Sequence, residues 1–168
     1  MNYNIIDNFL PKTEFERLKN IVQKEINWFF QASINSAHTE KDDDCYFTHS
    51  LFNYGHFPII ASNWLPEFKI ISDKLQINTL IRMKLNLYIK TNKIEVHKPH
   101  TDYNYSHKGC ILSFNTCNGA TIIYDENNTP IKIDSVENRA LLFDPSIPHS
   151  STSCTNAKAR FNVNINYF

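Results

Sequence analysis

Apolar and polar residues alternate along the second half of the chain with the two-residue period of β-strands. Residues 80–89 follow this pattern through much of their length, as expected of a strand with one buried face. Shorter β-rich runs follow, separated by turn-forming pairs such as Lys98-Pro99 and Asn118-Gly119. They cover residues 94–97, 109–114, 120–124, 131–133, 140–143 and 158–168. Short strands at regular spacing predict an all-β sandwich or barrel core.

The first half of the chain has helical spacing instead. Thr13 and Glu16 have the separation of a capping box, and apolar residues then recur every three or four positions as far as Ile26. A second helix is predicted over residues 63–75, and the aromatic residues 28–30 are expected in the core. The predicted fold class is therefore mainly β (α+β), a jelly roll with two or so N-terminal supporting helices.

Residues 31–48 are polar and include the charged run at 41–44. We interpret this segment as a solvated loop, because runs of charge are usually found on solvent-exposed faces. The alternative is a mobile lid over an active site, which loops of this length sometimes form. Substrate specificity is expected to lie in the loops at 31–57 and 103–108.

Composition and charge narrow the classes of protein. A chain of 168 residues without a linker or repeat predicts one domain spanning residues 1–168. Its 17 basic and 17 acidic side chains cancel, which weighs against a nucleic-acid partner. Neither a signal peptide nor a membrane-spanning apolar run is evident, so a soluble, cytoplasmic protein of unspecified oligomeric state is expected. The four cysteines form no C-x-x-C pair and are expected to be free thiols.

Candidate chemistry is concentrated in two histidines and one aspartate. Two imidazoles and a carboxylate bind non-haem Fe(II) and leave coordination positions open for chemistry. His100 and Asp102 are two residues apart, so an extended backbone presents both on one face. His149 follows the apolar run 140–143 and a turn, which would place it at the start of a strand. A histidine two residues before an acid is weak evidence alone, and His38 provides a second example in the polar loop.

Arg160 lies eleven residues after His149, in the last predicted strand. The guanidinium group is planar, permanently charged and able to bind a carboxylate through two hydrogen bonds. The chain has only four arginines, so an arginine at this place is informative. We therefore interpret Arg160 as a candidate anchor for a carboxylate-bearing cosubstrate.

His100-x-Asp102, His149 and Arg160 together resemble the signature of the 2-oxoglutarate/Fe(II)-dependent dioxygenase superfamily. Residues 80–168 carry this resemblance, and residues 3–10 are similar to the start of small prolyl-4-hydroxylase-like members. The resemblance implies a double-stranded β-helix core. It also implies Fe(II) at the three ligands, with 2-oxoglutarate as cosubstrate and O2 as oxidant.

The same resemblance suggests further site residues. Asn86-Leu87-Tyr88 is similar to the N-x-Y segment with which several relatives contact 2-oxoglutarate, so Asn86 and Tyr88 are candidate cosubstrate ligands. Asn162 lies two residues after Arg160, as an asparagine does in related motifs, and it is therefore also a candidate cosubstrate ligand. Tyr103 and Tyr105 directly follow the aspartate and are candidates to line the substrate entrance.

The implied reaction is hydroxylation of a C–H bond, coupled to decarboxylation of 2-oxoglutarate to succinate. The carboxylate of Asp102 favours hydroxylation, because halogenating relatives have a small residue at that position. The implied substrate is a protein side chain, for example a prolyl residue, or a small molecule. Animal prolyl 4-hydroxylases usually have lysine where this chain has Arg160, which argues against a collagen-like substrate.

Two alternatives stay open. The first is a jelly roll that binds a metal or a small acid without catalysis, because one fold supports many functions. The second is a nucleic-acid demethylase of the AlkB type, whose R-x-N-x-T-x-R motif this chain matches at Arg160 and Asn162 but not at Asn166. His97 and His107 are interpreted as residues around the ligands or on the surface, and Arg139 as a turn cap.

Overall fold

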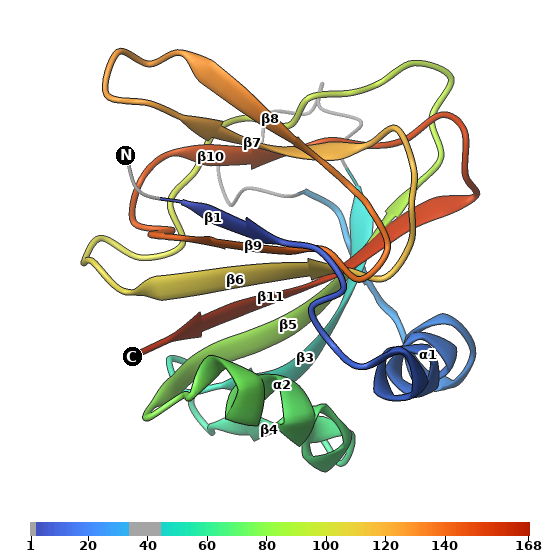
Figure 1. Cartoon of the computed structure of the whole chain (residues 1–168), viewed down its shortest axis with the longest axis vertical. Helices are drawn as coiled ribbons and strands as arrows, with labels where there is room; N and C mark the ends of the chain where they lie inside the picture. Colours follow the sequence, from blue (N-terminus) through green and yellow to red (C-terminus); the bar gives the residue numbers. More distant parts are fainter. Residues whose placement is uncertain (1–2, 34–44) are drawn as a thin grey trace.

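The computed structural model describes residues 3–33 and 45–168, which form a mainly β fold of two antiparallel sheets. Figure 1 shows the larger sheet fanning across the centre of the molecule and the smaller one above it. The larger sheet contains, in spatial order, β1 (Asn4–Ile6), β9 (Ala140–Phe143), β6 (Lys108–Ser113), β11 (Ala159–Tyr167), β5 (Leu80–Ile89), β3 (Tyr46–Asn53) and β2 (Phe29–Gln31), with β4 (Ile60–Ala61) paired to β3. The smaller contains β10 (His149–Ser151), β7 (Ala120–Tyr124) and β8 (Pro130–Asp134).

A small apolar cluster joins the two sheets. It consists of Ile111, Ile123, Ile133, Leu141 and Phe143, which come from β6, β7, β8 and β9. The sheets are therefore packed face to face, and the predicted jelly-roll fold class is confirmed.

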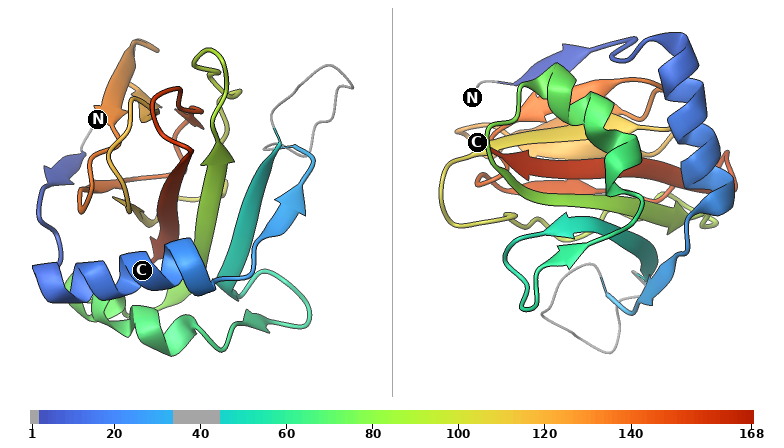
Figure 2. Two further views of the ribbon diagram at one scale, coloured as in Figure 1. Left: turned by 90° about the vertical axis from the view of Figure 1, so that its right-hand side faces the viewer. Right: turned by 90° about the horizontal axis from the view of Figure 1, so that it is seen from below.

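Two helices cover the other face of the larger sheet, as Figure 2 shows from below. Helix α1 (Lys12–Asn20) continues into a π-helical turn (Ile21–Glu25), and α2 (Lys69–Leu75) follows a short 3-10 helix (Leu65–Phe68). Both predicted helices are present. The capping box is wrong, because Pro11 is the N-cap residue of α1 and Thr13 lies inside the helix, with no side-chain cap hydrogen bond. The fixed φ of proline suits the start of a helix.

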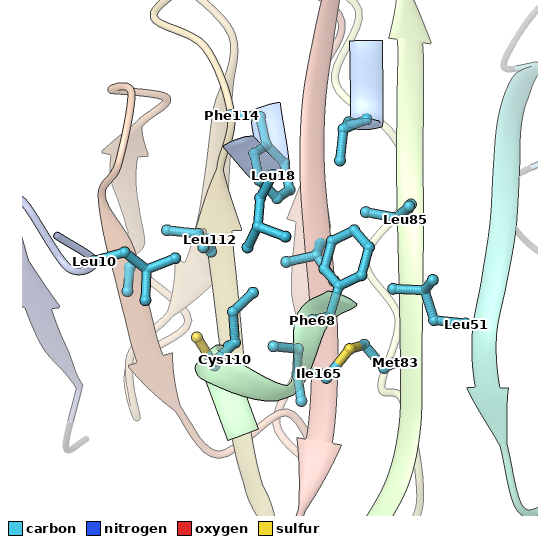
Figure 3. Packing of buried hydrophobic residues seen from close by; sticks show 14 of the residues in the cluster. Leu10, Leu18, Leu51, Phe68, Met83, Leu85, Cys110, Leu112, Phe114 and Ile165 are labelled. Atoms are coloured by element: carbon cyan, nitrogen blue, oxygen red, sulfur yellow. The ribbon is translucent and has the colours of Figure 1, made fainter. Parts of the chain in front are cut away.

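The main core lies between these helices and the larger sheet. Figure 3 shows leucine, phenylalanine and methionine side chains from both layers packed together. The fully buried residues in this cluster include Leu18, Leu51, Phe68, Ile71, Met83, Leu85, Leu112, Phe114, Val163 and Ile165. The cluster residues on β5 and β11 alternate along their strands with polar residues, which therefore project to the opposite face, toward the smaller sheet.

The strand predictions differ in their accuracy. The runs at 80–89, 120–124 and 140–143 match β5, β7 and β9 residue for residue, and three others differ from β6, β8 and β11 by one or two residues at their ends. The strand at 94–97 is wrong, because this segment makes only an isolated bridge between Val96 and Thr152.

The predicted polar loop at 31–48 is partly wrong. Its last residues belong to β3, where Tyr46 and Thr48 are buried. Polar residues alternate irregularly with aromatic ones there, which hid the strand. Residues 34–44 lie outside the described residues, so the charged run, His38 and the lid alternative are not addressed by the structure.

The aromatic residues after the first helix are not all in the core. Trp28 packs against the core cluster, but Phe29 and Phe30 are each 59% exposed. They lie on β2, which is the edge strand of the larger sheet and pairs only with β3 among the described strands. All four cysteines are free, as predicted. No helix in the described part of the chain is long and apolar enough to cross a membrane.

We expect truncation of Phe114 to be strongly destabilising. Its ring is fully buried and stacks on Phe15 with 5.9 Å between ring centroids. Phe114→Ala should lower the free energy of unfolding by about 3–5 kcal/mol, because the cavity adds to the lost burial. Tyr54→Ala is the control, since Tyr54 is 67% exposed and should change stability by less than about 0.5 kcal/mol. Urea denaturation compares them, and equal effects would contradict the described core.

Candidate metal centre

Two neighbouring strands present paired rows of polar side chains to the space between the sheets. The antiparallel register of β5 and β11 places each polar residue of one strand opposite a polar residue of the other. The intervening residues point into the helix-side core. The rows have a deep end, where Tyr88 and Arg160 are both buried. From this deep end outward, the opposed pairs are Tyr88 with Arg160, Asn86 with Asn162, Lys84 with Asn164 and Arg82 with Asn166.

His100 and His149 face one another across a backbone bridge. The amide of each residue donates to the carbonyl of the other, both at 2.9 Å, and the two rings lie 4.5 Å apart between centroids. His149 is the first residue of β10, as the sequence predicts. His100 lies outside the regular strands, so its placement comes from this one bridge rather than from an extended strand.

Asp102 is held by groups from three directions. Its Oδ1 forms an ion pair with Arg82 at 2.6 Å, Asn164 Nδ2 donates to its Oδ2 at 3.0 Å, and its amide donates to the Pro145 carbonyl at 2.9 Å. Burial by itself would raise the pKa of Asp102, but the Arg82 charge and the hydrogen bonds lower it well below its usual range. The carboxylate is therefore ionised and fixed in direction at neutral pH.

The three side chains converge. One potential ligand atom from each of His100, Asp102 and His149 lies within 4.8 Å of the others. His149 Nδ1 hydrogen-bonds the Ile147 carbonyl at 3.0 Å, whereas its Nε2 is buried and has no hydrogen-bond partner among the described residues. His100 Nδ1 is likewise buried and unpaired within that part of the chain. Buried polar atoms without partners are costly, and a metal ion would satisfy them.

The protonation state of these histidines also suits a metal ion. Burial lowers the pKa of His100 to about 4, and it lowers the pKa of His149 as well. Both rings are therefore neutral near pH 7 and keep a lone pair for coordination. Two neutral imidazoles and one carboxylate form the donor set typical of non-haem Fe(II) sites with open positions, so the residues present fit this ion.

Arg160 is a buried cation. The residue is only 1% exposed. Its guanidinium donates hydrogen bonds to the Thr152 carbonyl at 3.2 Å and to Thr121 Oγ1 at 2.8 Å. Within the described residues no carboxylate lies at salt-bridge distance from it, and burial lowers its pKa. A buried charge that lacks a counter-charge is unfavourable, so this arrangement favours an anionic ligand.

Tyr88 lies beside this guanidinium, with 5.4 Å between its ring centroid and Arg160 Cζ. Its ring stacks between Tyr46 and His97, with centroid distances of 5.5 and 5.4 Å. Burial raises the pKa of Tyr88, so the phenol keeps its proton and can donate a hydrogen bond. His97 is itself buried and hydrogen-bonds Ser151 Oγ at 2.8 Å, which agrees with its interpretation as a supporting residue.

Asn86 and Asn162 meet between the two ends of the site. Asn86 Nδ2 donates to Asn162 Oδ1 at 2.9 Å, and Asn86 Oδ1 is buried without a partner in the described structure. Both line one cavity together with the three candidate metal ligands. The structure thus brings together the metal-ligand and cosubstrate candidates, apart from Arg160, which contacts the cavity-lining residues Tyr88 and Thr121.

Tyr103 and Tyr105 lie outside the lining of this cavity, and their role at a substrate entrance stays a prediction. They stack on each other at 5.3 Å and do not belong to the described residues that line this cavity. Tyr103 packs against the Arg82 guanidinium at 5.5 Å, and Tyr105 stacks on Phe168 at 6.1 Å.

Sequence reasoning missed several polar residues of the site, among them Arg82, Lys84 and Asn164. Each alternates with apolar residues in a strand that was correctly predicted, and this was the available signal. Arg82 lies opposite Asn166, the position at which the demethylase motif has its final arginine. Arg82 forms its ion pair with Asp102 from β5, the strand that pairs with β11.

We expect the metal-free protein to lose stability in mild acid. Burial lowers the pKa of both His97 and His100 to about 4, whereas an unfolded histidine titrates near 6.5. Between these values the unfolded chain binds protons that the folded chain does not, so stability is complete above about pH 6.5 and falls as the pH drops toward 4. The expected loss from pH 7 to 4.5 is at least about 2 kcal/mol.

Urea denaturation in EDTA at several pH values measures this loss. His97→Phe should make the fall with pH shallower, because one of the titrating groups is removed. Stability that stays constant from pH 7 to 4.5 would contradict the neutral, buried histidines.

Known structures share this fold, although no family model and no curated protein sequence matches the chain. A 2OG-Fe(II) oxygenase family oxidoreductase from Burkholderia pseudomallei matches with a TM-score of 0.71 at 10% identity, over 98% of this chain and 84% of that one. A Trichoplax adhaerens prolyl hydroxylase in complex with a hypoxia inducible factor peptide fragment matches with a TM-score of 0.70 at 17% identity, over 99% and 83%. The chain has the 2-oxoglutarate oxygenase fold.

A third similar structure shows how varied the chemistry on this fold is. It is a non-heme α-ketoglutarate-dependent epimerase from nogalamycin biosynthesis, with a TM-score of 0.63 at 10% identity, over 99% of this chain and 77% of that one. Fold similarity at this level of identity does not specify a reaction, so any function must be argued from the site.

Proposed function

We propose that this protein is an Fe(II)- and 2-oxoglutarate-dependent dioxygenase that hydroxylates a C–H bond of its substrate. The observation that carries the proposal is the convergence of His100, Asp102 and His149 within 4.8 Å, in a cavity whose deep end approaches the buried Arg160. A protein that only binds a metal has no need for a buried guanidinium next to the metal site.

His100, Asp102 and His149 would hold the metal. Bound Fe(II) supplies the activation of O2 that couples substrate oxidation to conversion of 2-oxoglutarate to succinate and CO2. The histidines contribute neutral nitrogen donors, and Asp102 contributes one negative charge. Arg82 and Asn164 fix the direction of that carboxylate, as residues around a metal site commonly do for its ligands.

Arg160 and Tyr88 would bind the far carboxylate of 2-oxoglutarate. The guanidinium supplies the counter-charge, and the protonated Tyr88 hydroxyl supplies a hydrogen bond. Asn86 and Asn162 line the cavity between that end and the metal ligands. Their burial excludes water, which strengthens the charge pairing at the deep end.

Asp102 favours hydroxylation over halogenation, because its carboxylate occupies the place that a halide would need. The similar structures include a prolyl hydroxylase with a peptide and an epimerase, so both a protein side chain such as proline and a small molecule are candidate substrates. The cytoplasm, with its reduced thiols, is the proposed location.

Anaerobic spectroscopy tests the proposal. Adding Fe(II) and 2-oxoglutarate to the protein without oxygen should produce a visible metal-to-ligand charge-transfer band, and admitting O2 should release succinate. His149→Ala should give neither signal. If the wild-type protein gives neither, the non-catalytic binding protein becomes the better interpretation.

A second measurement addresses nucleic acid. A demethylase would bind oligonucleotides with an affinity that falls steeply with salt, because cationic side chains displace counterions from phosphates. We expect no such binding. Salt-dependent binding together with succinate release would instead favour the demethylase.

A further inference from the structure

Lys84 is a charged residue of the site to which the proposed chemistry assigns no role. It lies on β5 between Arg82 and Asn86 on the polar face, and it lines the same cavity as the three metal-ligand candidates. Its Nζ lies 3.4 Å from the Tyr46 hydroxyl and 5.6 Å from the centroid of that ring. Among the described residues no carboxylate lies at salt-bridge distance from it.

The charges at the site do not balance without a further anion. Three cationic side chains, which are Arg82, Lys84 and Arg160, lie along the polar face of β5 and β11, and the site has one carboxylate, Asp102. Arg82 is paired with that carboxylate at 2.6 Å, and the proposed function pairs Arg160 with 2-oxoglutarate. A divalent metal ion would add positive charge. Lys84 is therefore the cation without a counter-charge, and burying such a group is unfavourable.

The environment of Lys84 agrees with this imbalance. Burial and the Arg82 charge together lower the pKa of Lys84 to about 8, because Asp102 opposes them only in part. The ammonium form still predominates at pH 7, and a nearby anion would stabilise it. Lys84 also acts on the metal ligands, because its charge contributes to lowering the pKa of His100.

The place of Lys84 separates it from the cosubstrate anchor. Lys84 and Tyr88 are four residues apart on β5, which corresponds to about 13 Å along an extended strand. The far carboxylate of 2-oxoglutarate cannot meet both ends of this row. An anion at Lys84 would instead lie beside the metal-ligand candidates, between the position of Asn86 and that of Arg82, the ion-pair partner of Asp102.

We infer that Lys84 binds a carboxylate of the substrate, and that the substrate is consequently a small carboxylic acid. The inference rests on the proposed function, because that function supplies the partner of Arg160. A lysine ammonium suits this task, since it pairs with a carboxylate as a compact charge on a flexible stem. The aromatic ring of Tyr46 provides one wall next to the bound group.

Paired acids and amides test the inference. The full chain, loaded anaerobically with Fe(II) and 2-oxoglutarate, is titrated calorimetrically with the L-amino acids, simple monocarboxylic acids and the amide of each. We expect at least one acid to bind ten-fold or more tightly than its amide. Lys84→Met should reduce this preference from ten-fold or more to below about two-fold, a loss of at least about 0.9 kcal/mol. Lys84→Arg should retain most of it.

Lys132→Met is the matched control. Lys132 lies on β8, its side chain is 59% exposed, and it pairs with Asp134 at 2.9 Å. This variant should keep the preference for the acid. Lys132→Met should also bind 2-oxoglutarate within about two-fold of wild type, and a charge-transfer band in each variant establishes that it is folded.

Several results would overturn the inference. One is a wild-type protein that prefers no acid over its amide, and another is a preference that survives in Lys84→Met. A third is a ten-fold loss of 2-oxoglutarate affinity in Lys84→Met, which would make Lys84 a cosubstrate ligand. Absence of the charge-transfer band in wild type overturns the proposed function as well, whereas a normal band without any acid preference overturns this inference alone.

Discussion

Asp102→Gly will abolish 2-oxoglutarate turnover, with succinate release at least about 100-fold below wild type. Residues that merely orient metal ligands contribute 10–100-fold, so loss of a ligand should cost more. Removing this carboxylate also leaves Arg82 without its ion-pair partner, at 16% side-chain exposure, beside the two histidines. The metal ion would then lose its negatively charged ligand and would lie near the uncompensated positive charge of Arg82.

Succinate release and the anaerobic charge-transfer band measure this effect. Asp134→Asn is the control, because Asp134 is an exposed acid on β8 whose loss should change turnover by less than about two-fold. Asp102→Asn distinguishes charge from shape, since it keeps the size of the side chain. Succinate production by Asp102→Gly at the wild-type rate would remove Asp102 from the metal site.

The strands that could be predicted from the sequence are those with one apolar and one polar face. β5, β7 and β9 match their runs because their buried residues alternate or are continuous. All of β3 escaped prediction, since its buried residues include Thr48 and His49 as well as Tyr46. A strand that buries polar residues has no clear two-residue pattern of hydrophobicity.

The metal-ligand candidates were accessible to sequence reasoning because they occur with Arg160 in an order and spacing that resembles a known signature. Lys84, Arg82 and Asn164 were not, for a physical reason. A polar residue alternating with apolar ones in a strand usually faces solvent. Here the second sheet covers that face, so the same pattern describes an interior cavity. Only the packing of the two sheets distinguishes these cases.

Arg160 shows the opposite situation, because the sequence singles out this one residue and the structure shows its surroundings. A surface arginine would need no partner, whereas Arg160 is 1% exposed and hydrogen-bonds only neutral oxygens within the described residues. Binding of a dicarboxylate would pair this charge. The affinity for 2-oxoglutarate should therefore depend on Arg160 more than on any other residue outside the metal ligands.

Arg160→Met will weaken 2-oxoglutarate binding by about 100-fold, equivalent to about 2.7 kcal/mol. Methionine fills a similar volume but supplies neither charge nor hydrogen bonds. Arg160→Lys should give an intermediate loss, because an ammonium keeps the charge without the planar pair of donors. Arg139→Met is the matched control, since Arg139 pairs with Asp7 on the surface at 2.6 Å and should leave the affinity within about two-fold.

Thermal unfolding separates a loss of binding from a loss of structure. Without ligand, Arg160→Met should be nearly as stable as wild type, because removal of an unpaired buried charge offsets the lost hydrogen bonds to Thr121 and Thr152. With 2-oxoglutarate at 100 times its Kd, wild type should gain about 2.7 kcal/mol and the variant much less. Equal stabilisation of both proteins by 2-oxoglutarate would mean that the buried guanidinium balances some other anion, and that the cosubstrate site lies elsewhere.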